Sequence, residues 1–282
     1  MNTSFDYTIN VRGQLVSLAH PQVMGILNCT PDSFFAGSRK QTESEIAQRA
    51  NQIIEEGGTI IDVGAFSTRP GAAEVSEEEE MNRLRFALPV VRREQPDAIL
   101  SVDTYRPEVA RMVVEEYGAD IINDVSEGGL TGIVDTPLEQ TQDEYPEIFR
   151  MMGRLKVPYI LMSVQGNIHD MLMNFSREVQ QLRDLAVKDI ILDPGFGFGK
   201  SIDENYTILR DMDQLQVMNL PLLVGVSRKR MIHQLLGVTA DEALNGTTVV
   251  DTIALMHGAS ILRVHDVEAA VQAVKIVEAT NK

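Results

Sequence analysis

Ile-Ile-Leu-Asp, residues 190–193, is a short apolar run that ends in a carboxylate, and similar runs recur along the whole chain. These runs lack the polar alternation of a half-exposed strand and are typical of parallel strands that are buried on both faces. Most of them finish in a polar residue. The eight runs occupy residues 23–27, 60–64, 99–102, 120–123, 159–162, 190–192, 222–226 and 260–264.

Helical patterns with recognisable ends lie between the runs. Thr42 with Glu45 predicts a capping box at the start of one helix, and Ser76 with Glu79 predicts a second. Gly57 is expected to end the first of these helices, because glycine adopts the left-handed conformation that helix ends require.

Eight strands alternating with helices over 282 residues predict a (β/α)8 TIM barrel. Residues 5–19 are expected to add an N-terminal β-hairpin that turns at Arg12-Gly13, within a segment of residues 1–20. A doubly wound open sheet is the alternative fold. No repeat or linker divides the sequence, so we expect residues 1–282 to form a single domain.

Composition excludes several classes of protein. The chain has 25 Lys+Arg against 41 Asp+Glu, a net charge of −16, which disfavours general nucleic-acid binding. One cysteine excludes an internal disulfide framework. No apolar run approaches the roughly 20 residues that cross a bilayer, and the N-terminus lacks a signal-peptide pattern. We therefore expect a cytoplasmic protein.

Four familiar chemical motifs are absent. The glycine-rich segment 194–201 has Pro194 where a phosphate-binding loop needs its first glycine, and its glycine spacing does not fit the dinucleotide fingerprint. The five histidines have no metal-binding spacing, and there is no G-x-S-x-G nucleophile motif. Phe196 and Phe198 of this segment remain candidates for contact with a flat ligand.

In a barrel, the polar residues that end the strands meet at the rim that carries the active site. Asp103 and Asp193 each follow an apolar strand, where a carboxylate is costly unless it is paired. Cationic side chains also end strands, although the protein as a whole is acidic. Together they predict a pocket for an anionic group of a small molecule, such as phosphate. These cations are Arg69, Lys229, Arg263 and His265.

Seven sequence blocks together resemble the dihydropteroate synthase family, in family order and over nearly the whole chain. Examples are Met-Gly-Ile-Leu-Asn-Cys-Thr-Pro-Asp-Ser-Phe (24–34) and Ile-Ile-Leu-Asp-Pro-Gly-Phe-Gly-Phe-Gly-Lys (190–200). The others are residues 60–71, 100–104, 121–125, 224–230 and 263–267.

The resemblance implies a transferase of folate synthesis that is a target of sulfonamides. Its reaction joins p-aminobenzoate to 6-hydroxymethyl-7,8-dihydropterin diphosphate, and yields 7,8-dihydropteroate and pyrophosphate. The expected mechanism begins with departure of the diphosphate. The resemblance also implies a homodimer, with no nucleic-acid or membrane partner.

The family motifs assign residues to three parts of the expected site. The pterin would be held by Asp103, Asn123, Asp193, Lys229 and Arg263. The diphosphate would contact Asn28, Thr68, Arg69, Arg263 and His265, with Asn28 as the ligand of a Mg2+ cofactor. p-Aminobenzoate would lie against Phe34, Thr68, Pro70, Phe196, Phe198, Lys229 and Arg230. The catalytic residues would be Asp103, Lys229, Arg263 and His265.

Four features depart from the family pattern. Ser163 stands where a histidine is usual, and Arg230 stands where a serine usually follows the Ser-Arg-Lys motif. Residues 131–145 look like an insertion, and residues 164–188 look shorter than usual. Two other functions therefore stay open: a pterin-binding methyltransferase and a non-catalytic pterin-binding paralogue.

Overall fold

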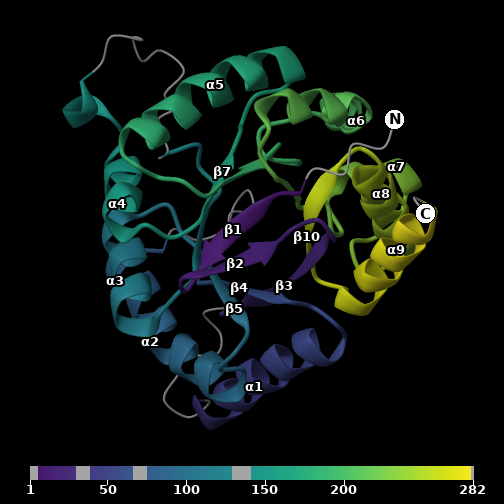
Figure 1. Cartoon of the computed structure of the whole chain (residues 1–282). Coiled ribbons are helices and arrows are strands. Elements are labelled where there is room, and N and C mark those ends of the chain that lie inside the picture. Colours follow the sequence, from purple (N-terminus) through teal and green to yellow (C-terminus); the bar gives the residue numbers. More distant parts are fainter. Residues whose placement is uncertain (1–5, 30–38, 66–74, 129–140, 281–282) are drawn as a thin grey trace.

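The structure is a computed structural model, and it describes residues 6–29, 39–65, 75–128 and 141–280. Eight parallel strands form a closed barrel in the order β10-β3-β4-β5-β6-β7-β8-β9, and helices surround it (Figure 1). The predicted TIM barrel is confirmed. The doubly wound open sheet is excluded, because β10 pairs with both β9 and β3. The barrel strands are β3 (Gln22–Asn28), β4 (Ile60–Gly64), β5 (Ile99–Asp103), β6 (Ile121–Asp124), β7 (Tyr159–Met162), β8 (Ile190–Asp193), β9 (Leu222–Val224) and β10 (Ala259–Val264).

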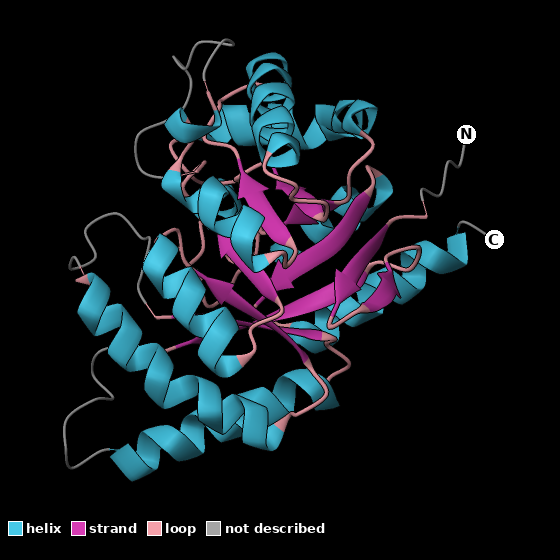
Figure 2. Ribbon diagram, turned by 60° about the vertical axis from the view of Figure 1, so that its left-hand side comes forward, coloured by secondary structure: helices cyan, strands magenta, loops and turns pink. Residues whose placement is uncertain are grey.

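Helices cover the outside of the strands, as Figure 2 shows. None of the described helices is long and apolar enough to cross a membrane. The helices are α1 (Arg39–Glu55), α2 (Glu77–Glu94), α3 (Pro107–Tyr117), α4 (Glu147–Leu155), α5 (Ile168–Asp184), α6 (Ile202–Asp211), α7 (Arg230–Leu236), α8 (Leu244–Met256) and α9 (Val267–Thr280), with 3-10 turns η3 (Gln142–Glu144) and η4 (Met212–Met218).

Of the two predicted capping boxes, the structure shows the Ser76 N-cap of the second. The Ser76 side chain accepts a hydrogen bond from the Glu79 N–H at 3.2 Å, and α2 begins at Glu77. The prediction for Thr42 is wrong, because α1 already begins at Arg39 and Thr42 is buried inside it. Thr42 cannot act as the N-cap, because the N–H groups two and three residues after it already donate to backbone carbonyls of the preceding turn.

The interior of the barrel changes from apolar to polar along the strands. Alternate residues of a strand point inward. Toward the amino ends of the strands these inward residues are aliphatic and form one buried cluster with the hairpin. The cluster comprises Ile9, Val11, Leu18, Met24, Ile60, Ile121, Ile160, Ile191, Leu223 and Ile261. Two residues further along, the same faces carry polar groups, which include Asp62, Ser101, Asn123, Asp193 and Arg263.

The predicted N-terminal hairpin, β1 (Thr8–Val11) and β2 (Gln14–Ser17), is also confirmed. It turns at Arg12 and Gly13, which both have positive φ, as a two-residue hairpin turn requires. The hairpin closes the amino end of the barrel, because Ile9 and Val11 pack into the aliphatic cluster. The polar rim therefore lies at the opposite end of the barrel.

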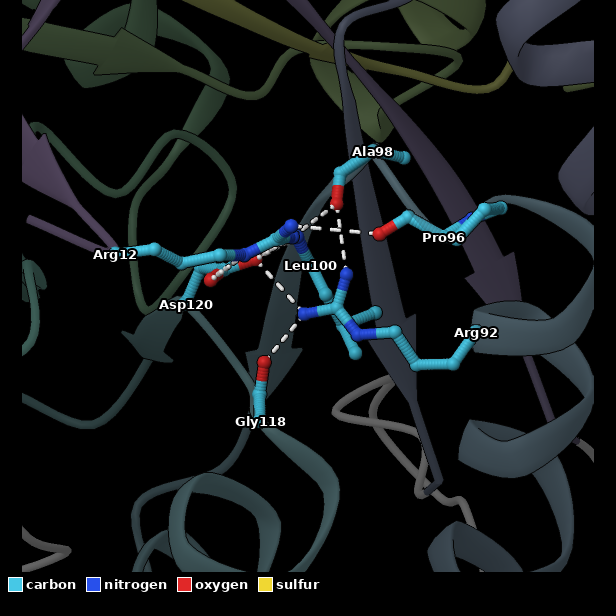
Figure 3. Close-up of polar contacts among 7 residues, drawn as sticks. All are labelled: Arg12, Arg92, Pro96, Ala98, Leu100, Gly118 and Asp120. Carbon is cyan, nitrogen blue, oxygen red and sulfur yellow. Dashed lines mark hydrogen bonds and ion pairs between the residues drawn. The ribbon is translucent and has the colours of Figure 1, made fainter. Parts of the chain in front are cut away.

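An arginine pair fixes the hairpin to the barrel (Figure 3). Arg12 and Arg92 both donate to Asp120, at 2.7 and 2.9 Å, and Asp120 also accepts from the Leu100 N–H at 2.9 Å. Both guanidinium groups donate to the Ala98 carbonyl as well. A cavity of about 450 Å³ adjoins this clamp and lies away from the polar rim.

Candidate active site

Asp62 gathers three hydrogen-bond donors inside the barrel. Its carboxylate accepts from Ser101 Oγ at 2.6 Å, from Arg263 Nε at 2.7 Å and from Asn123 Nδ2 at 3.2 Å. Arg263 Nη2 donates onward to Asp103 Oδ2 at 2.8 Å. Strands β4, β5, β6 and β10 thus contribute one connected polar network, in which Asp62 is fully buried.

Asp62 is a site residue that the pattern of polar strand ends does not predict. It lies in the middle of the run 60–64 rather than at its end. The sequence does contain a signal for it, since an acid inside an apolar strand is costly without partners. Asp103 and Asp193 are candidate site residues for the same physical reason.

The network leaves two buried acceptor atoms for a ligand. Asp103 Oδ1 and Asn123 Oδ1 have no hydrogen-bond partner among the described residues. Because the amide nitrogen of Asn123 donates to Asp62, its oxygen is the atom that remains to accept. Burial raises the pKa of Asp103 to about 7, with Arg263 opposing and Asp62 adding to the rise.

Asp193 ends β8 and begins the glycine-rich segment. Its Oδ1 accepts from the Gly195 N–H at 2.7 Å. Burial raises its pKa, and the charge of Lys229 opposes that rise most strongly. Gly195, Gly197 and Gly199 all have positive φ, so the segment is a tight turn.

Lys200 holds this turn against the end of β7. Its Nζ donates to the carbonyls of Ser163 and Gly195 at 2.9 Å each, and to that of Phe198 at 3.3 Å. Burial lowers the pKa of Lys200 to about 8. Ser163, where the family histidine is absent, is fully buried and donates to Glu127 Oε1 at 3.1 Å.

Lys229 joins the turn from the other side. Its Nζ donates to the Phe196 carbonyl and lies 4.7 Å from the centre of the Phe198 ring. Burial lowers its pKa to about 8, although Asp193 favours the charged form. The Phe196 side chain belongs to the hydrophobic core, whereas Phe198 is partly exposed. Arg230 is exposed and is the first residue of α7.

Asn28 ends strand β3, and His265 directly follows strand β10. A Cβ at Gly64 would lie 3.3 Å from Asn28 Oδ1 and 3.8 Å from Asp103 Cβ, so the missing side chain keeps this part of the rim open. His265 Nδ1 lies 3.0 Å from Ser227 Oγ. Among the described residues, no three His, Cys, Asp or Glu side chains form a metal site.

The structure thus brings most of the predicted residues to one end of the barrel. Asp103, Asn123 and Arg263 share the Asp62 network, and Lys229 contacts the turn that Asp193 begins. Four predicted residues lie outside the described residues: Phe34, Thr68, Arg69 and Pro70.

A closed barrel with buried acids, an arginine and a lysine at its mouth is the architecture of a ligand-binding barrel enzyme. The family model described as "pterin binding enzyme" matches residues 24–265. The chain belongs to this family.

Within the family, the chain is similar to dihydropteroate synthases over nearly its whole length. The enzyme of Escherichia coli is 41% identical over 95% of each chain. A Yersinia pestis dihydropteroate synthase with a sulfonamide drug complex has a TM-score of 0.82 at 37% identity, covering 98% of this chain and 99% of its own. A Xanthomonas albilineans dihydropteroate synthase with 4-aminobenzoic acid has a TM-score of 0.83 at 33% identity and 98% coverage of both chains. Fold, site and relatives together support dihydropteroate synthase activity, a transferase activity.

Proposed function

We propose that the chain condenses 6-hydroxymethyl-7,8-dihydropterin diphosphate with p-aminobenzoate, with the pterin bound inside the barrel mouth. One observation carries the proposal: among the described residues, the buried acceptors Asp103 Oδ1 and Asn123 Oδ1 have no hydrogen-bond partner, and Arg263 lies next to them. A buried acceptor is costly until a donor satisfies it. The amino and ring N–H groups of a pterin supply such donors.

Asp193 and Lys229 complete the proposed pterin site. Asp193 has one oxygen bonded to Gly195, and its second oxygen is the candidate acceptor for a pterin N–H. Lys229 would donate to a pterin acceptor atom after leaving the Phe196 carbonyl. Arg263 would stack beside the ring, held by Asp62 and Asp103.

The diphosphate would lie toward Asn28, Arg263 and His265, with Thr68 and Arg69 from the part of the chain outside the described residues. Asn28 fits a Mg2+ ligand, because its amide oxygen is a hard donor at the open rim and Mg2+ keeps most of its ligands from water and phosphate. Bound Mg2+ would neutralise negative charge on the leaving group.

The reaction would begin with ionisation. The bond from the pterin methylene carbon to oxygen breaks, and its electron pair leaves with the diphosphate. Asp103 would stabilise the resulting cation. The lone pair of the aniline nitrogen would then form the new C–N bond, and the nitrogen would release one proton to solvent water. Catalysis is then mainly electrostatic stabilisation and positioning.

p-Aminobenzoate would bind nearer the surface, against Phe198, Lys229 and Arg230, with Phe34, Thr68 and Pro70 as further candidates outside the described residues. Lys229 above the Phe198 ring supports this placement, because a cation and an aromatic face together suit a benzoate. The Phe196 side chain lies in the hydrophobic core, so this residue contacts Lys229 through its backbone carbonyl.

A turnover assay with both substrates tests the function directly. Release of pyrophosphate and formation of dihydropteroate are expected, and excess EDTA should abolish both. Product without diphosphate release would be inconsistent with this reaction. A chain that binds pterin without turnover would instead be a non-catalytic paralogue, and methyl transfer would identify the methyltransferase alternative.

Titration calorimetry tests the pterin site separately. Asp193→Ala should weaken pterin binding by roughly 1–3 kcal/mol or more, because ring donors lose a charged partner. Wild-type affinity in this variant would place the pterin elsewhere.

Binding of p-aminobenzoate should be much tighter with Mg2+ and pyrophosphate than without them. Equal affinities would favour direct displacement by the aniline nitrogen.

We also propose that residues 1–282 form one cytoplasmic domain that assembles as a homodimer. The outer surfaces of α7 and α8 support the dimer, because Leu235, Leu236, Val249 and Met256 are more than half exposed there. The one charged residue of α8, Asp251, is buried. Sedimentation equilibrium should give twice the chain mass, and Val249→Glu with Met256→Glu should reduce it. A monomer at micromolar concentration would contradict the proposal.

A further inference from the structure

Ser227 and His265 contact each other twice where strands β9 and β10 end. The backbone N–H of His265 donates to Ser227 Oγ at 3.2 Å, and the same oxygen lies 3.0 Å from Nδ1 of the His265 ring. Ser227 is buried, with 6% of its surface exposed. One hydroxyl oxygen therefore takes part in two hydrogen bonds to the same residue.

The donors and acceptors in this contact favour one tautomer of the ring. Ser227 Oγ has one proton to donate and two lone pairs, so it could accept from both the backbone N–H and an Nδ1–H group. The proton of this buried hydroxyl would then have no acceptor among the described residues. Donated to Nδ1, the proton has a partner, and Nδ1 carries the lone pair that receives it. In a neutral imidazole the hydrogen then sits on Nε2. We infer that Ser227 is a positioning residue that holds neutral His265 in the Nε2–H tautomer.

Groups other than Ser227 also hold the backbone around His265. Arg49 Nη2 donates to the His265 carbonyl at 2.6 Å, and the next residue, Asp266, forms a two-point ion pair with Arg228 at 2.8 and 2.9 Å. Because these contacts do not involve the Ser227 hydroxyl, its removal should change the tautomer and orientation of the ring more than the position of the chain.

The consequence for catalysis rests on the proposed function. An Nε2–H group can donate to an oxygen of the departing diphosphate without prior protonation of the ring. The other tautomer would turn a lone pair toward an anion and repel it. Ser227 would therefore make His265 a hydrogen-bond donor at neutral and mildly alkaline pH.

Long-range 1H–15N correlation of histidine-labelled enzyme without substrates reads the tautomer directly. The measurement is made near pH 8.5, about two units above the ordinary imidazole pKa. His265→Gln assigns the signals among the five histidines of the chain. We expect the Nε2–H pattern in the wild type and in Ser227→Thr, and an increase in the Nδ1–H form in Ser227→Ala. An Nδ1–H pattern in the wild type, or no change in Ser227→Ala, overturns the inference.

Turnover measures the catalytic consequence. Ser227→Ala should lower kcat about tenfold, less than the roughly 100-fold loss of a whole oxyanion donor. Ser227→Thr should restore most of the rate. The matched control is Ser176→Ala. The Ser176 hydroxyl donates to the Leu172 carbonyl on the exposed side of α5, and its loss should leave rate and tautomer unchanged. A changed tautomer with unchanged turnover would refute the assignment of His265 to the diphosphate and leave the tautomer inference intact.

Discussion

Asp62 determines the orientation of the side chains that bond to it. Its carboxylate fixes the guanidinium of Arg263 and the amide of Asn123, and those two groups in turn define which atoms face a ligand. A buried carboxylate with three donors is satisfied. The acceptor atoms that have no partner among the described residues are Asp103 Oδ1 and Asn123 Oδ1, and a bound molecule can reach them.

Asp62→Asn should destabilise the protein and alter the site together. Loss of the charge leaves Arg263 with Asp103 alone, and we expect the free energy of unfolding in urea at pH 7 to fall by about 3 kcal/mol. The pKa of Asp103 should also fall below about 7, because the negative charge of Asp62 helps to raise it.

Ser101→Ala is the matched control, since it removes a single hydrogen bond to the same carboxylate. It should cost about 1 kcal/mol. Equal losses in the two variants would mean that the charge of Asp62 contributes nothing beyond one hydrogen bond.

The turn after β8 shows why the glycine-rich segment 194–201 needs glycine at particular positions. A Cβ at Gly195 would lie 2.1 Å from the Ser163 carbonyl oxygen, whereas one at Gly199 would meet nothing within 4 Å. Both residues have similar positive φ values, 66° and 64°. The pair therefore separates backbone strain from a steric clash.

Gly195→Ala should lower the free energy of unfolding by at least about 3 kcal/mol and reduce turnover, because the turn must move away from Ser163. Gly199→Ala should cost only about 1 kcal/mol, the strain of a left-handed alanine. Thermal or urea unfolding of the two variants side by side measures the difference. Similar losses would show that the turn relaxes without cost.

Helix α8 contains a buried acid that the proposed reaction does not use. Burial, with a smaller contribution from Asp266, raises the pKa of Asp251 from 3.8 to about 7. Between these values the folded state holds a proton that the unfolded state has lost. Stability therefore falls as the pH rises through this window, and the loss is complete above about pH 7.

Asp251→Asn removes this pH dependence, because an amide does not titrate. The difference in unfolding free energy between the variant and the wild type should grow by about 2–3 kcal/mol in favour of the variant between about pH 5 and 7.5. Urea unfolding at both values measures it. A constant difference would indicate that Asp251 keeps an ordinary pKa in the folded protein.

The strands and the positions of the rim residues could be predicted from sequence, because each barrel strand carries its own apolar run and its own polar end. Relations between elements could not. That Asp62 pairs with Arg263, 201 residues away, depends on barrel closure. The different surroundings of Phe196 and Phe198 depend on a left-handed turn that composition does not define.

At the scale of the whole molecule, the barrel separates its two ends by polarity. The carboxyl ends of the strands hold the polar network, while the amino ends are aliphatic and closed by the hairpin. Stability and ligand binding are thus assigned to opposite ends, as in other TIM barrels. The clamp of Arg12, Arg92 and Asp120 secures the closed end (Figure 3).

Asp120→Asn should therefore cost stability while leaving the catalytic end intact. Burial alone would raise the pKa of Asp120, but hydrogen bonds from Arg12 and Arg92 hold it below 3.8. Its contribution is present above that value and is lost as the pH falls through the lower folded-state pKa. We expect a loss of about 3 kcal/mol at pH 7, because two arginines lose their shared partner. Arg12→Ala should cost only about 1 kcal/mol, since its side chain is 43% exposed and screened by solvent. The double variant should lose less unfolding free energy than the sum of the two single losses, because both changes remove the same ion pair. Full additivity in urea unfolding would show that this clamp does not act as described. A lower kcat at temperatures where the variants are folded would show the same.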